Sequence, residues 1–179
     1  MSEDFEACVR GGGVAVFPAD TVYGLACDPD DAAAVARMYA LKGRDPGKPA
    51  ALMRFSTAGL PPLGPRTATV VRRLLPGAIT VLVPGGEGVI GLRVPDVPLL
   101  AGVTIAVLQT SANHAGGPDA RRLADVPADI RAGADLEIDG GELPGTPSTV
   151  VDLTAYVADG SWSIVREGAV PVATLRAVL

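Results

Sequence analysis

Short apolar runs and segments with helically spaced apolar residues alternate along this chain of 179 residues. Apolar runs bounded by glycine, proline or polar residues are typical of buried strands, and apolar residues three or four positions apart are typical of helices. We expect helices before the glycines at 11–13, after the Pro-Asp-Asp at 29–31, and over 67–75, 127–132 and 172–179. We expect strands over 14–17, 49–55, 78–83, 89–94, 104–108, 136–139, 148–153 and 162–166.

This order of elements predicts the fold class. Strands and helices alternate, several strands follow one another directly, and no internal repeat or linker divides the chain. We therefore expect a single α/β domain over residues 1–179, built on a twisted, open, mixed sheet with flanking helices. Polar segments at 18–25 and 109–113 come directly after apolar runs. Ligands of α/β sheets bind beyond strand ends, so both segments are candidate site segments.

Composition narrows the function classes. Apolar residues make up 48% and aromatic residues only 4%, so Val, Leu and Ala must fill the core. The formal net charge of −5 argues against a general nucleic-acid coat, which needs a basic field, but leaves room for a local basic cleft. Cys8 and Cys27 have no metal-binding or redox spacing, and free thiols suit a reducing cytoplasm.

No membrane or metal site is expected. The longest uncharged run, 97–118, has an apolar part of about 12 residues, too short to span a bilayer. Acidic residues occupy the N-terminus, where a signal peptide would be basic. The single His114 and the scattered carboxylates do not form a zinc pattern.

A cluster of basic residues is the first candidate for chemistry. The chain has only two lysines, Lys42 and Lys48, and Arg44 lies between them. The glycines and proline within 43–47 kink the segment, so the three cations can converge from a loop on one polyanion such as phosphate. A solvated basic turn is an equally good interpretation of this segment alone. A Walker loop is excluded, because the glycine spacing is one residue short and Pro49 follows the lysine.

Smaller polar groups end other predicted strands. In an extended segment Ser111 and Asn113 point the same way and can bond a ligand, although a Ser or Asx turn is the alternative. Thr149 and Ser148 open a strand with two hydroxyls. Arg166 ends a strand, where it can bind a ligand or pair with Glu167.

These segments, taken together, resemble the YrdC/Sua5/TsaC family. The resemblance extends from about residue 11 to residue 168. The motifs, in family order, are Pro18-x-Asp20-Thr21-Val22-Tyr23-Gly24-Leu25, Lys42-x-Arg44 with Lys48-Pro49, Pro76-Gly77-x-x-Thr80, Arg93-x-Pro95, Thr110-Ser111-Ala112-Asn113, Ser148-Thr149-Val150-Val151-Asp152 and Arg166-x-Gly168.

The resemblance implies a fold and an activity. The family fold is a twisted open sheet around a deep basic cleft. Its best-known activity is L-threonylcarbamoyladenylate synthesis, in which L-threonine, bicarbonate and ATP give threonylcarbamoyl-AMP and pyrophosphate. This product leads to the t6A37 modification of tRNA, which a downstream transferase completes. Magnesium would be held mainly by the phosphates, because the sequence offers no carboxylate cluster.

The resemblance also implies residue roles. Lys42 and Arg44 would be catalytic and, with Lys48, would grip the triphosphate. Thr80, Ser111 and Asn113 would contact ATP or the threonine carbamate, and Ser148 and Arg166 would close the nucleotide site. The amino-acid side would consist of Thr21, Tyr23, Arg93 and Thr149.

Three positions depart from the family pattern. Ala19 replaces a threonine of the first motif, Met53 stands where some members carry a polar residue or a histidine, and Asp119 stands where a serine often occurs. Since Ala19 lacks a hydroxyl expected near the amino acid, we expect weaker threonine selectivity. The alternative function is a non-catalytic protein that binds nucleotide or, weakly, double-stranded RNA. The acidic charge and the lack of interleaved basic and aromatic residues argue against it.

Overall fold

The computed structural model describes residues 1–86 and 88–179. Its strands are β1 (Ala15–Pro18), β2 (Tyr23–Cys27), β3 (Ala51–Met53), β4 (Ile79–Gly85), β5 (Gly88–Arg93), β6 (Val107–Ser111), β7 (Leu136–Glu137), β8 (Thr149–Asp152) and β9 (Ser163–Arg166). Its helices are α1 (Ser2–Arg10), α2 (Ala32–Lys42), α3 (Pro65–Leu74), α4 (Ala128–Gly133), α5 (Tyr156–Asp159) and α6 (Val172–Val178), with 3-10 turns η1 (Thr57–Gly59), η2 (Pro98–Leu100) and η3 (Leu123–Asp125).

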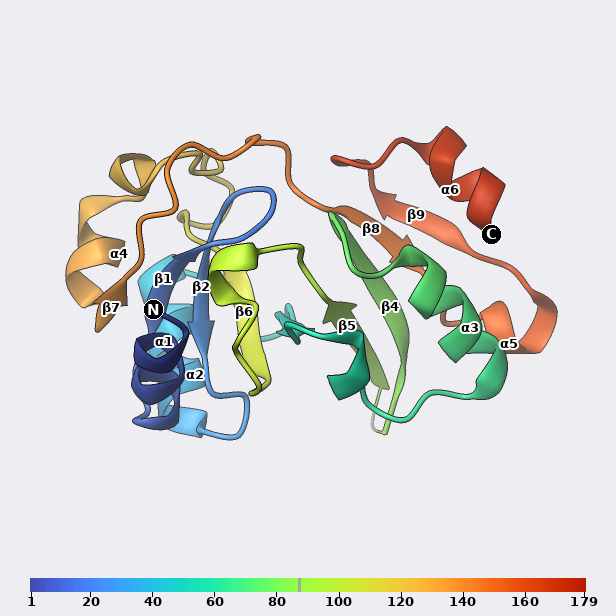
Figure 1. Cartoon of the computed structure of the whole chain (residues 1–179), viewed down its shortest axis with the longest axis horizontal. Coiled ribbons are helices and arrows are strands. Elements are labelled where there is room, and N and C mark those ends of the chain that lie inside the picture. Colours follow the sequence, from blue (N-terminus) through green and yellow to red (C-terminus); the bar gives the residue numbers. More distant parts are fainter. Residues whose placement is uncertain (87) are drawn as a thin grey trace.

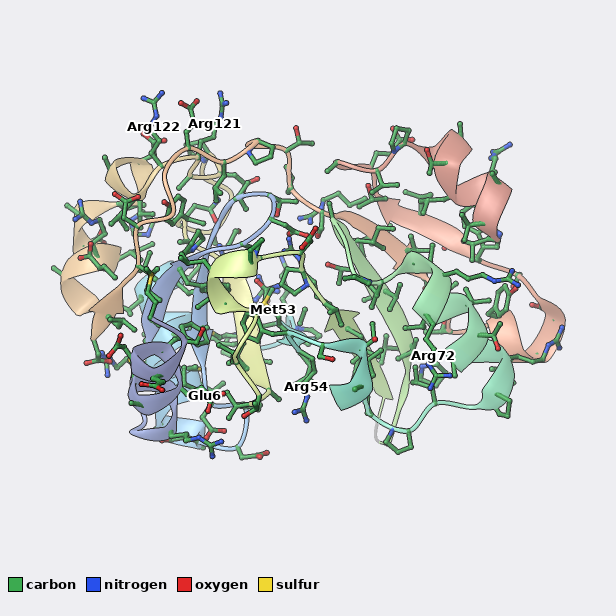
Figure 2. The ribbon with its side chains drawn as sticks, in the orientation of Figure 1. Glu6, Met53, Arg54, Arg72, Arg121 and Arg122 are labelled. Carbon is green, nitrogen blue, oxygen red and sulfur yellow. The ribbon has the colours of Figure 1, made fainter. Side chains whose placement is uncertain are left out.

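The strands form one mixed sheet in the order β7-β1-β2-β6-β3-β5-β4-β8-β9. Figure 1 shows the sheet as two halves: β7, β1, β2 and β6 with α1, α2 and α4, and β5, β4, β8 and β9 with α3, α5 and α6. Strand β3 joins them, because it pairs antiparallel with β6 and parallel with β5. Met53, at the end of β3, is fully buried and lies near the middle of the molecule (Figure 2).

The N-terminal half is covered on both faces of its sheet. Phe5 of α1 packs with Phe17 of β1 on one face, and Met38 of α2 packs with Leu25 of β2 on the other. Helix α2 begins at the Asp31 carboxylate, which accepts hydrogen bonds from two backbone N–H groups of its first turn. It ends at Gly43, whose φ of 62° turns the chain away and leaves Lys42 on the last turn.

Among the described residues, helices cover only one face of the sheet in the C-terminal half. Val81 of β4 and Val151 of β8 pack with Val71 and Leu74 of α3 and Leu175 of α6. Side chains alternate along a strand, so the residues between them point to the opposite face. That face borders the cavity described below.

The predicted mixed α/β sheet is confirmed, with differences in detail. The segment 18–25, a polar segment for which no strand is predicted, contains the start of β2, which is buried because it pairs with both β1 and β6. The strand expected at 104–108 is displaced to Val107–Ser111. Helix α5 was not expected. Within the described residues, no helix combines the length and apolarity that crossing a membrane requires.

Candidate active site

A cavity of about 490 Å³ lies between the two halves of the sheet. Its walls come from both halves and from the loop after α2. The floor of the cavity is formed by strands β4, β5 and β8. Because side chains alternate between the two faces of a strand, every second residue of these strands points into the cavity. These floor residues are Thr80 and Leu82, Val89, Gly91 and Arg93, and Ser148, Val150 and Asp152.

At one end of this floor lies the Arg93 cluster, consisting of Arg93, Asp20 and Thr21. Arg93 is 4% exposed, and its Nη2 donates to the Asp20 carboxylate and, at 2.6 Å, to the Thr21 hydroxyl. Asp20 also accepts from the backbone N–H of Asp96 at 3.2 Å, which ties the loop after β1 to the loop after β5. Nε of Arg93 is buried without a hydrogen-bond partner in the part of the chain that the structure describes. Arg93 therefore lines the cavity with a guanidinium whose donors are not all used by the described residues.

Behind the opposite wall lies the Lys42 cluster, consisting of Lys42, Ser111 and Asn113. Nζ of Lys42 lies 2.9 Å from Ser111 O, 3.3 Å from Ser111 Oγ, 2.8 Å from Asn113 O and 2.7 Å from Asn113 Oδ1. Burial lowers the pKa of Lys42 to about 8, and Arg44 acts in the same direction while Asp119 opposes it. The ammonium therefore holds the end of β6 and the following turn in place.

The loop after α2 is held by its own arginine. Arg44 donates from Nε to Lys48 O at 2.8 Å and from Nη2 to Pro49 O at 2.8 Å, and its Nη1 lies 3.4 Å from the Thr110 hydroxyl. Its guanidinium also lies 5.8 Å from the centre of the Tyr39 ring. Arg44 lines the cavity, whereas Lys48 is exposed and does not.

Hydroxyl groups and a third arginine complete the C-terminal wall. The hydroxyls of Thr80 and Ser148 lie 2.9 Å apart, and Nη2 of Arg166 donates to Ser148 O at 2.8 Å. Desolvation lowers the pKa of Arg166; Asp119 opposes this effect and Arg93 adds to it. Since Arg44, Arg93 and Arg166 repel one another across one cavity, an anionic ligand would relieve that repulsion.

The sequence matches one family model over most of its length. The Sua5_yciO_yrdC model, described as telomere recombination, matches residues 7–168. The chain belongs to the Sua5/YciO/YrdC family. The threonylcarbamoyl-AMP synthase of Chromohalobacter salexigens is 38% identical to it over 170 residues, which cover 84% of this chain and 91% of that protein.

Two solved members of the Sua5/YciO/YrdC family share the fold. E. coli YciO matches with a TM-score of 0.79 at 27% identity, over 96% of this chain and 90% of YciO. Pyrococcus abyssi Sua5 in complex with L-threonine matches with a TM-score of 0.85 at 25% identity over 99% of this chain. This chain spans only 57% of the Sua5 chain.

Most of the residues that resemblance to the family singles out lie around one cavity. Seven of them line it: Tyr23, Arg44, Thr80, Arg93, Ser111, Ser148 and Arg166. Thr21, Lys42 and Asn113 lie one contact behind the wall, through their hydrogen bonds to Arg93 and Ser111. Lys48 is the predicted cation that lies outside the cavity in the surface loop.

The geometry does not support two predicted amino-acid contacts. The Thr149 hydroxyl faces away from the cavity, donates to Val170 O at 2.8 Å and accepts from Val170 N at 3.0 Å. Alternation along β8 explains this, because Ser148 and Val150 are its cavity-facing neighbours. The Tyr23 hydroxyl is engaged with Asp139, Gly140 and Gly141. Neither hydroxyl is free for substrate.

Ala19 also lies away from the expected place. It is 3% exposed and packs in the core cluster beside α1, and it does not line the cavity. Since the missing hydroxyl would sit in that core, the expected loss of threonine selectivity at this position has no support in the geometry.

Sequence reasoning missed several cavity residues. The family motifs contain Asp20, Thr110 and Asp152 without giving them a role, and Gln109 lies in a candidate segment without one. Had the strand been predicted at 107–111, alternation would have placed Gln109 on the same face as Ser111. The described residues contain no group of three or more His, Cys, Asp or Glu side chains able to hold a metal ion, and Asp152 is the carboxylate that lines the cavity.

Proposed function

We propose that this protein is a threonylcarbamoyl-AMP synthase. It would convert L-threonine and bicarbonate to the threonine carbamate and water, and the carbamate oxygen would then attack the α-phosphorus of ATP. A bond between the carbamate oxygen and phosphorus forms, the bond to the bridging oxygen breaks, and pyrophosphate leaves. The observation that carries this proposal is the convergence of Arg44, Arg93 and Arg166 on one cavity.

The cavity suits a reaction that depends on positioning. Substitution at phosphorus is catalysed mainly by holding the reactants in line and by placing cations near the developing charge. Arg44 would bind the phosphates after releasing the carbonyls of its own loop, and Lys48 would approach from that loop. The hydroxyls of Ser111, Thr80 and Ser148 would orient the nucleotide, and Arg166 would close over it. Lys42 and Asn113 would support this site from behind.

The Arg93 cluster would form the amino-acid side. The unused N–H groups of Arg93 suit the threonine carboxylate, because a guanidinium binds carboxylates through several donors at once. Asp20 and Thr21 would hold the guanidinium in position. A magnesium ion carried by the phosphates would neutralise part of their charge. The described residues fit that arrangement better than a protein-bound metal, since Asp152 alone supplies a cavity carboxylate.

The test is pyrophosphate release in the presence of ATP, bicarbonate and threonine. We expect release that depends on all three substrates. Reactions without threonine or without bicarbonate serve as controls for simple ATP hydrolysis. ATP binding without any release would favour the non-catalytic nucleotide-binding alternative. The chain would act in the cytoplasm and would supply its product to a transferase that modifies tRNA.

A further inference from the structure

Gln109 is the one glutamine of the chain, and the proposed reaction gives it no role. It lies on β6, is 7% exposed and lines the cavity. Among the residues described, its side-chain amide makes no hydrogen bond. Buried amides in folded proteins are nearly always paired. An unpaired one that borders a cavity is suited to bind a ligand.

The floor of the cavity beside Gln109 is lined by residues with small side chains or none. Gln109 pairs with Ala51 of β3, and Gly91 of β5 lies beyond Ala51. A Cβ atom at Gly91 would lie 3.3 Å from Cβ of Ala51 and 3.5 Å from Cδ2 of Leu82. Glycine within a strand often marks a place where a ligand approaches the backbone closely. A small planar group can therefore lie on this floor beside the amide.

Gln109 stands between the two ends of the cavity. Ser111 is two residues along the same strand, so its Cα lies about 7 Å away. Arg93 is two strands across and one pleat repeat along in the opposite direction, so its Cα lies about 12 Å away. In the proposed function, phosphate occupies the Ser111 side and the amino acid occupies the Arg93 side. The group that joins them derives from bicarbonate.

The amide matches this group chemically. Its Nε2 donates and its Oε1 accepts side by side. Bicarbonate offers an oxygen acceptor beside an O–H donor, and a carbamate offers an oxygen acceptor beside an N–H donor. Phosphate offers acceptors and would leave Oε1 unpaired. We propose that Gln109 binds bicarbonate and then the threonine carbamate through this pair of hydrogen bonds. The inference rests on the proposed function.

The Gln109 amide would keep the bound group in one orientation while bicarbonate is converted to the carbamate. The threonine nitrogen forms a bond to the bicarbonate carbon, and the carbon–hydroxyl bond breaks. The hydroxyl takes one amine proton and leaves as water. The carbamate keeps its second N–H proton, which then faces Oε1 where the bicarbonate O–H was. Gln109 would thereby place the carbamate oxygen toward the α-phosphorus.

The test compares Gln109→Ala with the wild type in KM for each substrate. We expect the KM for bicarbonate to rise about tenfold to a hundredfold, as for lost hydrogen bonds to a charged group. The KM values for ATP and threonine should change by less than about threefold. The melting temperature of the free protein should stay unchanged, because the amide has no partner among the described residues to leave unpaired. Gln109→Glu should lose more activity, since its carboxylate repels the anion.

A control and a second measurement separate the outcomes. Leu108→Val alters the neighbouring residue of β6, which packs against the α2 side, and should leave all three KM values unchanged. With ATP and threonine present, bicarbonate should raise the melting temperature of the wild type but not of Gln109→Ala. An unchanged bicarbonate KM in Gln109→Ala, or a rise in the ATP KM instead, overturns the assignment. If the wild type forms no adduct, the proposed function itself fails.

Discussion

The Arg93 cluster and the Lys42 cluster each bury a cation that is 4% exposed, yet they use its charge differently. The ammonium of Lys42 lies among four oxygens of Ser111 and Asn113 and behind the cavity wall. Within residues 1–86 and 88–179, the guanidinium of Arg93 donates only through Nη2, to Asp20 and Thr21, and it borders the cavity.

A cation that binds substrate and a cation that supports the fold differ in the donors that remain free. Both residues belong to motifs that resemblance to the family assigns to substrates. What distinguishes them is the number of donors left over after the fold has been satisfied. Arg93 has a carboxylate partner that offsets the cost of burying its charge, whereas Lys42 is paired with neutral oxygens. We therefore expect changes at Arg93 to remove a substrate contact in addition to destabilising the fold, and changes at Lys42 to act through stability.

The largest effect is expected for Arg93→Ala. It leaves the Asp20 carboxylate nearly buried without its partner, which costs about 3–5 kcal/mol of unfolding free energy. Pyrophosphate release should become undetectable. Urea denaturation and the release assay measure the two effects. The double variant Arg93→Leu with Asp20→Asn should recover stability without activity, and recovered activity would contradict the role of Arg93.

The next effect is expected for Arg44→Ala. Two of its hydrogen-bond partners are backbone carbonyls of an exposed loop and the third is the Thr110 hydroxyl at 3.4 Å, so stability should change little. If Arg44 binds phosphate, the loss of a charge-assisted contact of about 1.5–3 kcal/mol weakens ATP binding about tenfold to a hundredfold. Calorimetric titration with ATP measures the affinity. Unchanged affinity would remove Arg44 from the phosphate site.

Lys42→Met should lower stability more than Arg44→Ala does, and should weaken ATP binding less. It removes the donor shared by Ser111 and Asn113, which should cost about 1–3 kcal/mol of unfolding free energy. ATP binding should weaken less than in Arg44→Ala, because Lys42 does not line the cavity. Denaturation and ATP titration of both variants provide the comparison. A stable Lys42→Met protein that cannot bind ATP would show that the ammonium contacts phosphate directly.

The pH dependence of stability sharpens the same contrast. Burial lowers the pKa of Lys42 to about 8 from an ordinary value of 10.5. Below pH 8 both the folded and the unfolded chain carry the proton, and the cost of burying the charge is fully present. Between these values the folded chain loses its proton first, so the unfolding free energy of the wild type should rise relative to Lys42→Met. Denaturation curves across this range measure the difference, and a relative fall would contradict the lowered pKa.

The smallest effect is expected for Lys48→Ala. Its side chain is exposed and makes no hydrogen bond among the described residues. An exposed charge contributes about 0.2–1 kcal/mol, so ATP affinity should fall by at most about fivefold. Lys48→Arg should restore it. A loss as large as that of Arg44→Ala would mean that the loop closes and brings Lys48 onto the phosphates.

The sequence anticipated the elements and the motifs better than the contacts. Periodicity predicted α3 and β4 because their apolar faces are regular. It missed β2, whose residues 23–24 lie in a motif that looks like a loop, because burial comes from pairing with two distant strands. Motif spacing brought Arg44 and Arg93 to one cavity. It could not reveal that Thr149 points away or that the Gln109 amide has no partner among the residues that the structure describes, since both depend on strand register.

Surface arginines also show what the sequence alone does not reveal about the site. Figure 2 shows Arg121 and Arg122 projecting from the edge of the N-terminal half, and both pair with Glu142. The amino-acid composition does not distinguish these two arginines from Arg44 and Arg93. Only the three-dimensional arrangement separates arginines that serve the surface from those that surround the cavity.

The most direct test of the central claim follows carbon from bicarbonate into the product. Wild-type protein, ATP, threonine and ¹³C-labelled bicarbonate are mixed, and the nucleotide adducts are analysed by mass spectrometry. We expect a threonylcarbamoyl-AMP that carries the label, formed by the wild type and by Lys48→Ala but not by Arg93→Ala. A wild-type protein that binds ATP but forms no labelled adduct would contradict this expectation.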